Sequence, residues 1–237
     1  MKRDVGKEEE EMENELSRLS SGIVGLDDMI EGGFPLPSVI LVAGSAGTGK
    51  TTFAQKFLFD GARKGEQGIY FTTLSEPTEW MLRFTSRYEF VIKDYFGREI
   101  VYVDLGNELR ETRPYEFLSY IDERISEIQP QRIVIDPMTV VGPTDSSYRQ
   151  FLYDMINRLK NWNTVSVVTG EVEPGLLYPP EIAYSVDGII LLRMEEEGEI
   201  RRKYLEVLKM RGTNHVTGKH SMDITTSQGI VVLKSQF

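Results

Sequence analysis

Cysteine is absent from this 237-residue sequence. The chain therefore cannot form a disulfide bond or a zinc site built on thiolates. Histidine is also scarce, because His215 and His220 are its two histidines. They stand close together without the neighbouring ligands that a zinc site needs, and we expect the His220 side chain to be partly exposed.

Long apolar runs are missing as well. No stretch approaches the roughly 20 apolar residues that a membrane-spanning helix requires. The N-terminus is acidic, unlike that of a secretory signal. From these features we expect a soluble, cytoplasmic protein that has no membrane partner.

Basic residues are outnumbered, 27 against 37 acidic ones, which gives a formal charge of −10. We expect residues 1–17 to be an acidic tail that is disordered or a frayed helix, or else an arm that packs on a neighbouring molecule. Residues 18–237 then form one folded domain. The net charge indicates no broad nucleic-acid footprint, although it leaves a local basic pore or loop open.

A glycine-rich stretch fits the phosphate-binding pattern G-x-x-x-x-G-K-[ST]. An apolar run at residues 39–43 precedes it and predicts a buried strand, and residues 51–64 carry the apolar spacing of a helix. Strand, loop and helix in this order place backbone N–H groups and the positive end of the helix dipole against a phosphate. The stretch consists of Gly44, Ser45, Ala46, Gly47, Thr48, Gly49, Lys50 and Thr51.

The same motif assigns roles to single residues. We expect Lys50 to reach the β- and γ-phosphates of a nucleotide and the Thr51 hydroxyl to hold Mg²⁺. Thr52 is counted with the nucleotide-binding stretch. The motif by itself does not say what the phosphate energy is used for.

Strands and helices alternate along the middle of the chain, which predicts parallel βαβ units. The expected strands are residues 68–74, 100–103, 132–136 and 164–169, and the expected helices are residues 115–128 and 149–162. A further helix begins at Pro77 and carries Trp80, Met81 and Phe84 on one face. After residue 185 the expected strands are residues 187–194, 204–210, 221–225 and 230–233. Short turns join them, so we expect an antiparallel extension of the sheet.

Acidic residues follow two of the expected strands. Asp136 ends a buried strand, where a carboxylate can hold Mg²⁺, or it can cap the next segment. Glu76 can orient or deprotonate an attacking water, or it can stabilise the N-terminus of the next helix. Thr169 and Glu171 can sense the γ-phosphate, although capping and turn polarity explain them nearly as well.

Two cations near the C-terminus are ambiguous from the residues alone. Lys209 and Arg211 are two positions apart on a strand and so project to the same face. They can stabilise charge on a transferring phosphate, as an arginine finger does, or they can form a solvated strand end.

Taken together, these stretches make the chain resemble the KaiC-like branch of the RecA/RadA ATPase superfamily over about residues 18–237. The P-loop alone is shared by many families, whereas its combination with the stretch Leu208-Lys209-Met210-Arg211-Gly212-Thr213 is much more specific. The other stretches that carry the resemblance are residues 21–27, 133–136 and 187–192.

The resemblance implies a RecA-type α/β fold with a mostly parallel central sheet and helices on both faces. It also implies a homo-oligomeric ring, commonly a hexamer, with ATP at the subunit interfaces. In such a ring, Lys209 and Arg211 act on the γ-phosphate bound by the neighbouring subunit, with Thr213 and His215 nearby. Assembly would then be a condition of activity.

Two departures from the family pattern bear on activity. The family often has two adjacent glutamates after the second strand, whereas here Glu76 stands alone between Ser75 and Pro77. A slow ATPase is therefore expected. The family's circadian clock protein phosphorylates itself on a Ser-Thr pair that is not retained in register here. We therefore do not expect clock-type autokinase activity, for which Tyr184 and Ser185 are the remaining candidate acceptors.

Three functional hypotheses follow. The main one is an oligomeric, Mg²⁺-dependent ATPase, with Lys50, Glu76 and Asp136 from one subunit and Lys209 and Arg211 from the next. The alternative is a nucleotide-gated scaffold or regulatory module with negligible turnover, motivated by the missing glutamate. The third is a DNA-repair or recombination factor, which rests on analogy of fold. Residues 142–147 and 172–182, where such proteins contact DNA, contain no Lys or Arg, so we expect weak or no DNA binding.

Overall fold

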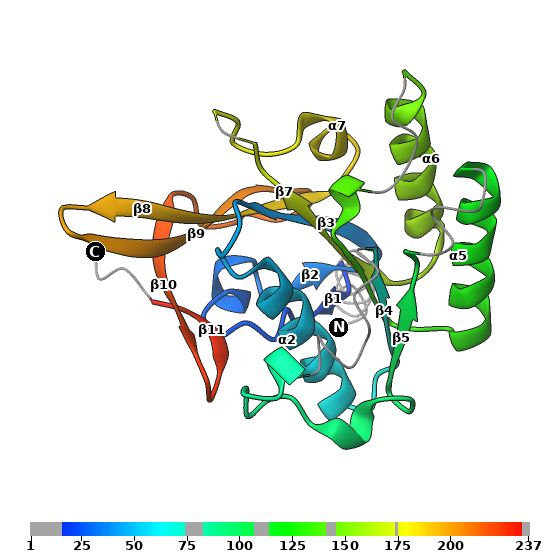
Figure 1. Cartoon of the computed structure of the whole chain (residues 1–237), viewed down its shortest axis with the longest axis horizontal. Helices are drawn as coiled ribbons and strands as arrows, with labels where there is room; N and C mark the ends of the chain where they lie inside the picture. The colour runs from blue at the N-terminus through cyan, green and yellow to red at the C-terminus, as the bar shows by residue number, and fades with distance from the viewer. Residues whose placement is uncertain (1–15, 74–82, 107–113, 141–145, 174, 234–237) are drawn as a thin grey trace, which may run out of the picture.

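A nine-stranded sheet with the order β11-β10-β9-β8-β3-β7-β6-β4-β5 forms the centre of the computed structural model (Figure 1). The structure describes residues 16–73, 83–106, 114–140, 146–173 and 175–233. The strands from β5 to β8 in this order are parallel to one another. They are β3 (Ser38–Gly44), β4 (Gly68–Thr72), β5 (Ile100–Asp104), β6 (Arg132–Asp136), β7 (Val165–Glu171) and β8 (Gly188–Glu197).

Parallel strands are covered on both faces, so their sequences are near-continuous apolar runs. In β3 all seven residues are buried, and side chains alternate between the two faces. Ile40 and Val42 join one hydrophobic cluster, whereas Val39, Leu41 and Ala43 join the other.

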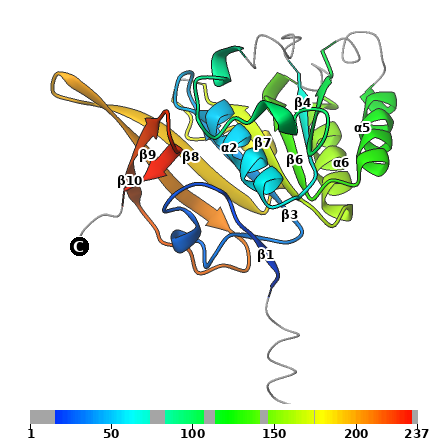
Figure 2. The same cartoon turned by 90° about the horizontal axis from the view of Figure 1, so that it is seen from below.

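Helices cover both faces of this sheet (Figures 1 and 2). Helix α2 (Lys50–Arg63) packs on one face, and α5 (Pro114–Ile128), α6 (Tyr148–Asn161) and the short α7 (Pro180–Ala183) lie on the other. The described residues also form the 3-10 turns η1 (Asp27–Met29), η2 (Lys93–Tyr95) and η3 (Met138–Val140).

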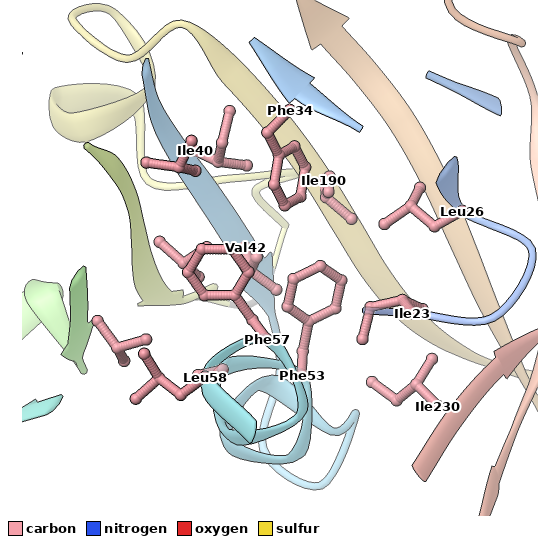
Figure 3. Packing of buried hydrophobic residues seen from close by; sticks show 14 of the residues in the cluster. Ile23, Leu26, Phe34, Ile40, Val42, Phe53, Phe57, Leu58, Ile190 and Ile230 are labelled. Atoms are coloured by element: carbon pink, nitrogen blue, oxygen red, sulfur yellow. The ribbon is translucent and has the colours of Figure 1, made fainter. Parts of the chain in front are cut away.

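The packing of α2 brings distant parts of the chain together (Figure 3). Phe53 and Phe57 of α2 lie against β3 and β8, and Ile230 of β11 and Ile23 of the N-terminal loop close the same cluster. Phe34 meets Phe57 edge to face at 6.0 Å between ring centroids. The phosphate-loop helix is therefore held by both ends of the folded chain.

An antiparallel extension continues the sheet beyond β8. It consists of β9 (Ile200–Met210), β10 (Lys219–Thr225) and β11 (Gly229–Val232), while β1 (Arg18–Leu19) and β2 (Phe34–Pro35) form a separate small sheet. The β8–β9 hairpin reaches beyond the other strands (Figure 2). Opposite charges face each other along it, as in the pairs of Glu196 with Arg201 and Glu197 with Arg202.

The predicted architecture is confirmed, and most expected element boundaries lie within a few residues of the observed ones. The apolar stripe predicted for residues 149–162 is buried in α6 at Phe151, Leu152, Met155, Ile156 and Leu159. No helix among the described residues is both long enough and apolar enough to cross a lipid bilayer.

One smaller expectation was wrong. His220 is 5% exposed, because β10 turns its ring inward and Nε2 lies 3.3 Å from the Thr217 carbonyl. Phe84, which was expected to share one face of a helix with Trp80 and Met81, is 66% exposed. Its expected partners Trp80 and Met81 lie outside the described residues.

A buried arginine joins the N-terminal segment to α2 and the sheet. Arg132, 1% exposed, donates from Nη1 to the carbonyls of Phe57 at 2.7 Å and Ser20 at 2.9 Å. Its Nε donates to Glu66, and Asp60 lies 3.6 Å from Nη2. Because the guanidinium is withdrawn from water, these partners are required to hold it there.

We predict that Arg132→Met destabilises the fold by about 3 kcal/mol, because it removes the hydrogen bonds that Arg132 donates to Glu66 and to two carbonyls and the ion pair with Asp60. Chemical denaturation followed by circular dichroism measures the change. The control is Arg98→Met, since Arg98 is 72% exposed and makes one ion pair at 3.8 Å. Equal stabilities of the two variants would contradict the assignment.

Candidate nucleotide-binding site

The phosphate-binding loop runs from the end of β3 into α2. Gly49 precedes the first residue of α2, and its φ of 108° is a left-handed conformation that favours glycine. A Cβ there would also lie 2.7 Å from Cδ1 of Ile224 on β10. The backbone conformation therefore favours glycine at this position, and any larger side chain would also have to displace Ile224.

The other end of the loop is equally tight. A Cβ on Gly44 would lie 2.5 Å from the Leu192 carbonyl oxygen of β8 and 2.5 Å from Oγ1 of Thr48. Thr48 in turn donates from Oγ1 to the Ser45 carbonyl at 2.9 Å. Between them, Gly47 takes a φ of 79°. The loop thus closes on itself through its own residues.

Lys50 lies over this loop at the start of α2. Its Nζ donates to the carbonyls of Gly44 and Ser45, both at 2.9 Å. Burial lowers the pKa of Lys50, and the nearby carboxylates of Glu171 and Asp136 oppose that shift. The ammonium group is held where a phosphate bound by the loop would meet it.

Asp136 lies at the end of β6 and is 7% exposed. Three hydroxyl groups donate to its carboxylate: Thr51 at 2.8 Å to Oδ2, Tyr70 also to Oδ2, and Thr169 to Oδ1. The strand register explains the meeting, because Thr72 of β4 pairs with Asp136 at the carboxyl edge of the sheet. Thr51 reaches the same carboxylate from the first turn of α2, so the predicted pair Thr51 and Asp136 meets there.

The donor set at this point is suited to a hard cation. A carboxylate and a threonine hydroxyl are oxygen ligands of the kind that Mg²⁺ takes together with phosphate oxygens and water. Among the described residues, no group of three or more His, Cys, Asp or Glu side chains forms a self-sufficient metal site. The residues present fit Mg²⁺ bound with a nucleotide.

Sequence reasoning missed Tyr70. It occupies the middle of an apolar strand, β4, and its ring stacks on Tyr102 with 4.8 Å between centroids. Burial, reinforced by the negative charge of Asp136, raises the pKa of Tyr102. A tyrosine in a buried strand indicates a hydroxyl that needs a hydrogen-bond partner, but the sequence does not say that this partner is Asp136.

The other predicted residues near the loop differ in their contacts. Thr52 points to Tyr88, with 3.4 Å between the two hydroxyl oxygens. Glu171 ends β7 beside Gly44, and its N–H donates to Oγ1 of Thr139 at 3.3 Å. Ala46 is exposed at the tip of the loop. Glu76 lies outside the described residues.

Lys209 and Arg211 lie at the opposite end of the parallel strands, where β3 and β8 begin. Lys209 donates from Nζ to the Val186 carbonyl at 2.6 Å, and Arg211 Nη1 lies 3.2 Å from Oδ1 of Asp187. Burial lowers the pKa of Lys209, and the positive charge of Arg211 lowers it further. Lys209 belongs to β9, whereas Arg211 lies just after that strand.

The remaining residues of this segment lie nearby. Oγ1 of Thr213 accepts a hydrogen bond from Nη1 of Arg18 at 3.0 Å. Arg18 also donates to the Gly212 carbonyl at 3.2 Å. His215 is half-buried in the same turn, which the N–H of Val216 ties to the Met29 carbonyl at 2.9 Å.

The two groups of predicted residues are therefore separated. Asp187, the partner of Arg211, pairs by backbone hydrogen bonding with Val39 at the start of β3. Gly44 ends the same strand five residues later, which is about 16 Å of extended chain. The structure brings Lys50, Thr51 and Asp136 together and leaves Lys209 and Arg211 at the opposite edge.

We predict that Tyr70→Phe destabilises the nucleotide-free protein by about 1.5–3 kcal/mol, because a buried carboxylate loses a hydrogen-bond donor. Urea denaturation measures the difference. Tyr153→Phe is the matched control, since Tyr153 is 53% exposed on α6 and should change stability by less than about 0.5 kcal/mol. A Tyr70→Phe protein as stable as this control would show that the hydroxyl does not hold Asp136.

Comparison with known proteins places the chain in a family. The family model described as "ATPase: KaiC" matches residues 19–236. A UPF0273 protein of Pyrococcus horikoshii is 31% identical over 234 residues, which are 91% of this chain and 93% of that protein. The circadian clock oscillator protein KaiC of Parathermosynechococcus lividus is 31% identical over 228 residues, which are 89% of this chain and 41% of the clock protein.

A solved structure supports the same conclusion. The crystal structure of a KaiC-like protein from Pyrococcus horikoshii superimposes with a TM-score of 0.82 at 31% identity, covering 93% of this chain and 100% of that one. The chain thus spans less than half of the clock protein but nearly the whole of the shorter relatives. The phosphate loop, the strand order and these matches together show that the chain belongs to the KaiC family of RecA-type ATPases.

Proposed function

We propose that the chain is a Mg²⁺-dependent ATPase that works as a homo-oligomeric ring, with each active site shared between two subunits. A hexamer is the assembly that this family suggests. Residues 18–237 form the ATPase domain, and the acidic residues 1–17 precede it. The proposal goes beyond family membership in naming the metal, the assembly and the residues of the site.

One subunit would supply the nucleotide-binding half of the site. The loop N–H groups and Lys50 bind the phosphates, and Thr51 and Asp136 hold Mg²⁺ with the nucleotide. Bound there, Mg²⁺ neutralises charge on the phosphate oxygens. Thr169 and Tyr70 keep the Asp136 carboxylate in place, and Lys50 is close enough to exchange its loop carbonyls for phosphate oxygens.

The separation of the two residue groups carries the proposal of a shared site. Arg211 is 58% exposed at the amino end of β3, and the phosphate loop lies at the carboxyl end. A single subunit cannot bring them to one phosphate without breaking its central sheet. Head-to-tail assembly can, because it apposes opposite edges of neighbouring subunits.

Hydrolysis also needs a group that orients the attacking water. Glu76 is the candidate, and it acts alone where the family often has two glutamates. We therefore propose slow turnover. A nucleotide-gated scaffold with negligible turnover is the opposing outcome, and phosphate release distinguishes the two.

We predict that Lys50→Ala and Arg211→Ala each lower ATP hydrolysis on the order of 10³-fold, because each removes an oriented positive charge from the transferring phosphate. Released phosphate is measured with Mg²⁺ and again with EDTA, which should abolish turnover. Arg201→Ala is the matched control, since Arg201 is an exposed arginine of β9 that pairs with Glu196. Undiminished turnover in both test variants would contradict the assignment of these residues to an ATPase site.

Mixing these variants tests the shared site. Lys50→Ala subunits keep Arg211, and Arg211→Ala subunits keep Lys50, so a mixed ring contains some complete sites. We expect the mixture to recover a measurable part of the wild-type rate. The mass of the assembly with and without ATP is recorded in the same samples, and an intact mixed ring without recovery argues against action between subunits.

A further inference from the structure

Asp187 connects the exposed cations to the strand that carries the phosphate loop. Its backbone N–H donates to the Val39 carbonyl at 2.9 Å, and its Oδ2 accepts from the Val39 N–H at 3.1 Å. Its own carbonyl accepts from the Arg211 N–H at 3.0 Å. Asp187 is thus hydrogen-bonded both to Val39, near the start of β3, and to Arg211, which follows β9.

The carboxylate of Asp187 also holds side chains. Its Oδ1 lies 3.2 Å from Arg211 Nη1 and 2.9 Å from Lys160 Nζ. Lys209 lies beside this group, and we call Lys160, Asp187, Lys209 and Arg211 the Asp187 cluster. Three cations thus surround one carboxylate in a protein whose formal charge is −10. The cluster keeps a positive charge and favours an anion.

The contacts of Arg211 leave it able to bind that anion. Within the described part of the chain, its side-chain hydrogen bond uses Nη1, so Nη2 and Nε remain to donate. The side chain is 58% exposed, whereas the Asp187 side chain is 18% exposed. An arginine held by one nitrogen on a fixed carboxylate has fewer orientations to lose when its other nitrogens meet a phosphate.

Lys160 gives the Asp187 carboxylate a second positively charged partner. It comes from α6, donates to the Ser185 carbonyl at 2.7 Å and lies against Asp187 at the same time. When Arg211 binds an anion, Lys160 still pairs with the negative charge of Asp187. The carboxylate is then not left as an unpaired, largely buried charge.

We propose that Asp187 is a positioning residue for Arg211, holding the guanidinium toward the phosphate bound by the next subunit and tying it to β3. The proposal rests on the shared site described above. The carboxyl end of β3 leads into the phosphate loop of its own subunit. The same strand therefore connects the nucleotide bound by that subunit to Arg211, which reaches the nucleotide of the next subunit. Lys160 acts as the second counter-ion that keeps Asp187 neutralised.

The test is Asp187→Asn, which keeps an oxygen for the Val39 N–H and removes the charge. We expect the hydrolysis rate at saturating ATP to fall about tenfold, as for other groups that orient an active side chain, with ATP-dependent assembly unchanged. Glu206→Gln is the matched control, because Glu206 pairs with Arg193 and is also 18% exposed. A rate for Asp187→Asn equal to that of the control overturns the proposal.

Placement in mixed rings separates positioning from general damage. In a mixture of Lys50→Ala and Arg211→Ala subunits, the Lys50→Ala subunit supplies the working arginine. Adding Asp187→Asn to that subunit should lower the recovered rate about tenfold, and adding it to the Arg211→Ala subunit should leave the rate unchanged. Equal losses in both arrangements would show a structural role and overturn the proposal.

The outcome is also distinguishable from failure of the proposed function. If Arg211→Ala hydrolyses ATP at the wild-type rate, the shared site itself is wrong. If Arg211→Ala is impaired and Asp187→Asn is as active as wild type, the shared site stands and the positioning role is wrong. In the Arg211→Ala background, Asp187→Asn should add no further loss.

Discussion

Strand β3 is the constraint on which both halves of the candidate machinery depend. It lies between β7 and β8, and all of its seven residues are buried. Its carboxyl end opens into the phosphate loop at Gly44, and its amino end is bonded twice to Asp187. An extended strand hydrogen-bonded on both sides cannot shorten, so the two ends remain apart. The sheet that builds the loop thereby prevents one subunit from completing the site in our proposal.

The buried carboxylate of Asp136 explains much of the local design. A charge taken out of water is costly unless hydrogen bonds replace the lost hydration. Thr51, Tyr70 and Thr169 provide these bonds from α2, β4 and β7. The arrangement keeps the carboxylate oriented. In our proposal this carboxylate receives a metal ion together with the nucleotide.

Charge is distributed in a way that the net value conceals. The chain is acidic overall, yet Lys160, Lys209 and Arg211 gather around one carboxylate at the amino edge of the sheet. At the other edge, Lys50 lies among loop carbonyls and near Glu171 and Asp136. Cationic side chains at two separate ends of the sheet, rather than one continuous basic surface, fit recognition of a small anion from two sides better than binding of a long polyanion.

Much of the fold could be predicted from the sequence because its signals are local. Continuous apolar runs marked the parallel strands, and the apolar spacing of residues 149–162 identified the buried stripe of α6. Phe84 shows the limit of such patterns, since helical spacing cannot say whether a neighbouring surface exists to bury it. The same limit applies to His220, which β10 turns into the interior.

The sequence by itself determined the phosphate loop, because its glycines and Lys50 act through backbone geometry within a few residues. It also placed Asp136 at a strand end. Only the tertiary structure decided that the Tyr70 hydroxyl meets Asp136 and that Asp187 holds both Arg211 and Lys160. These contacts join residues from different elements. Strand order and register set such distances, and those follow from packing of the whole chain rather than from any local pattern.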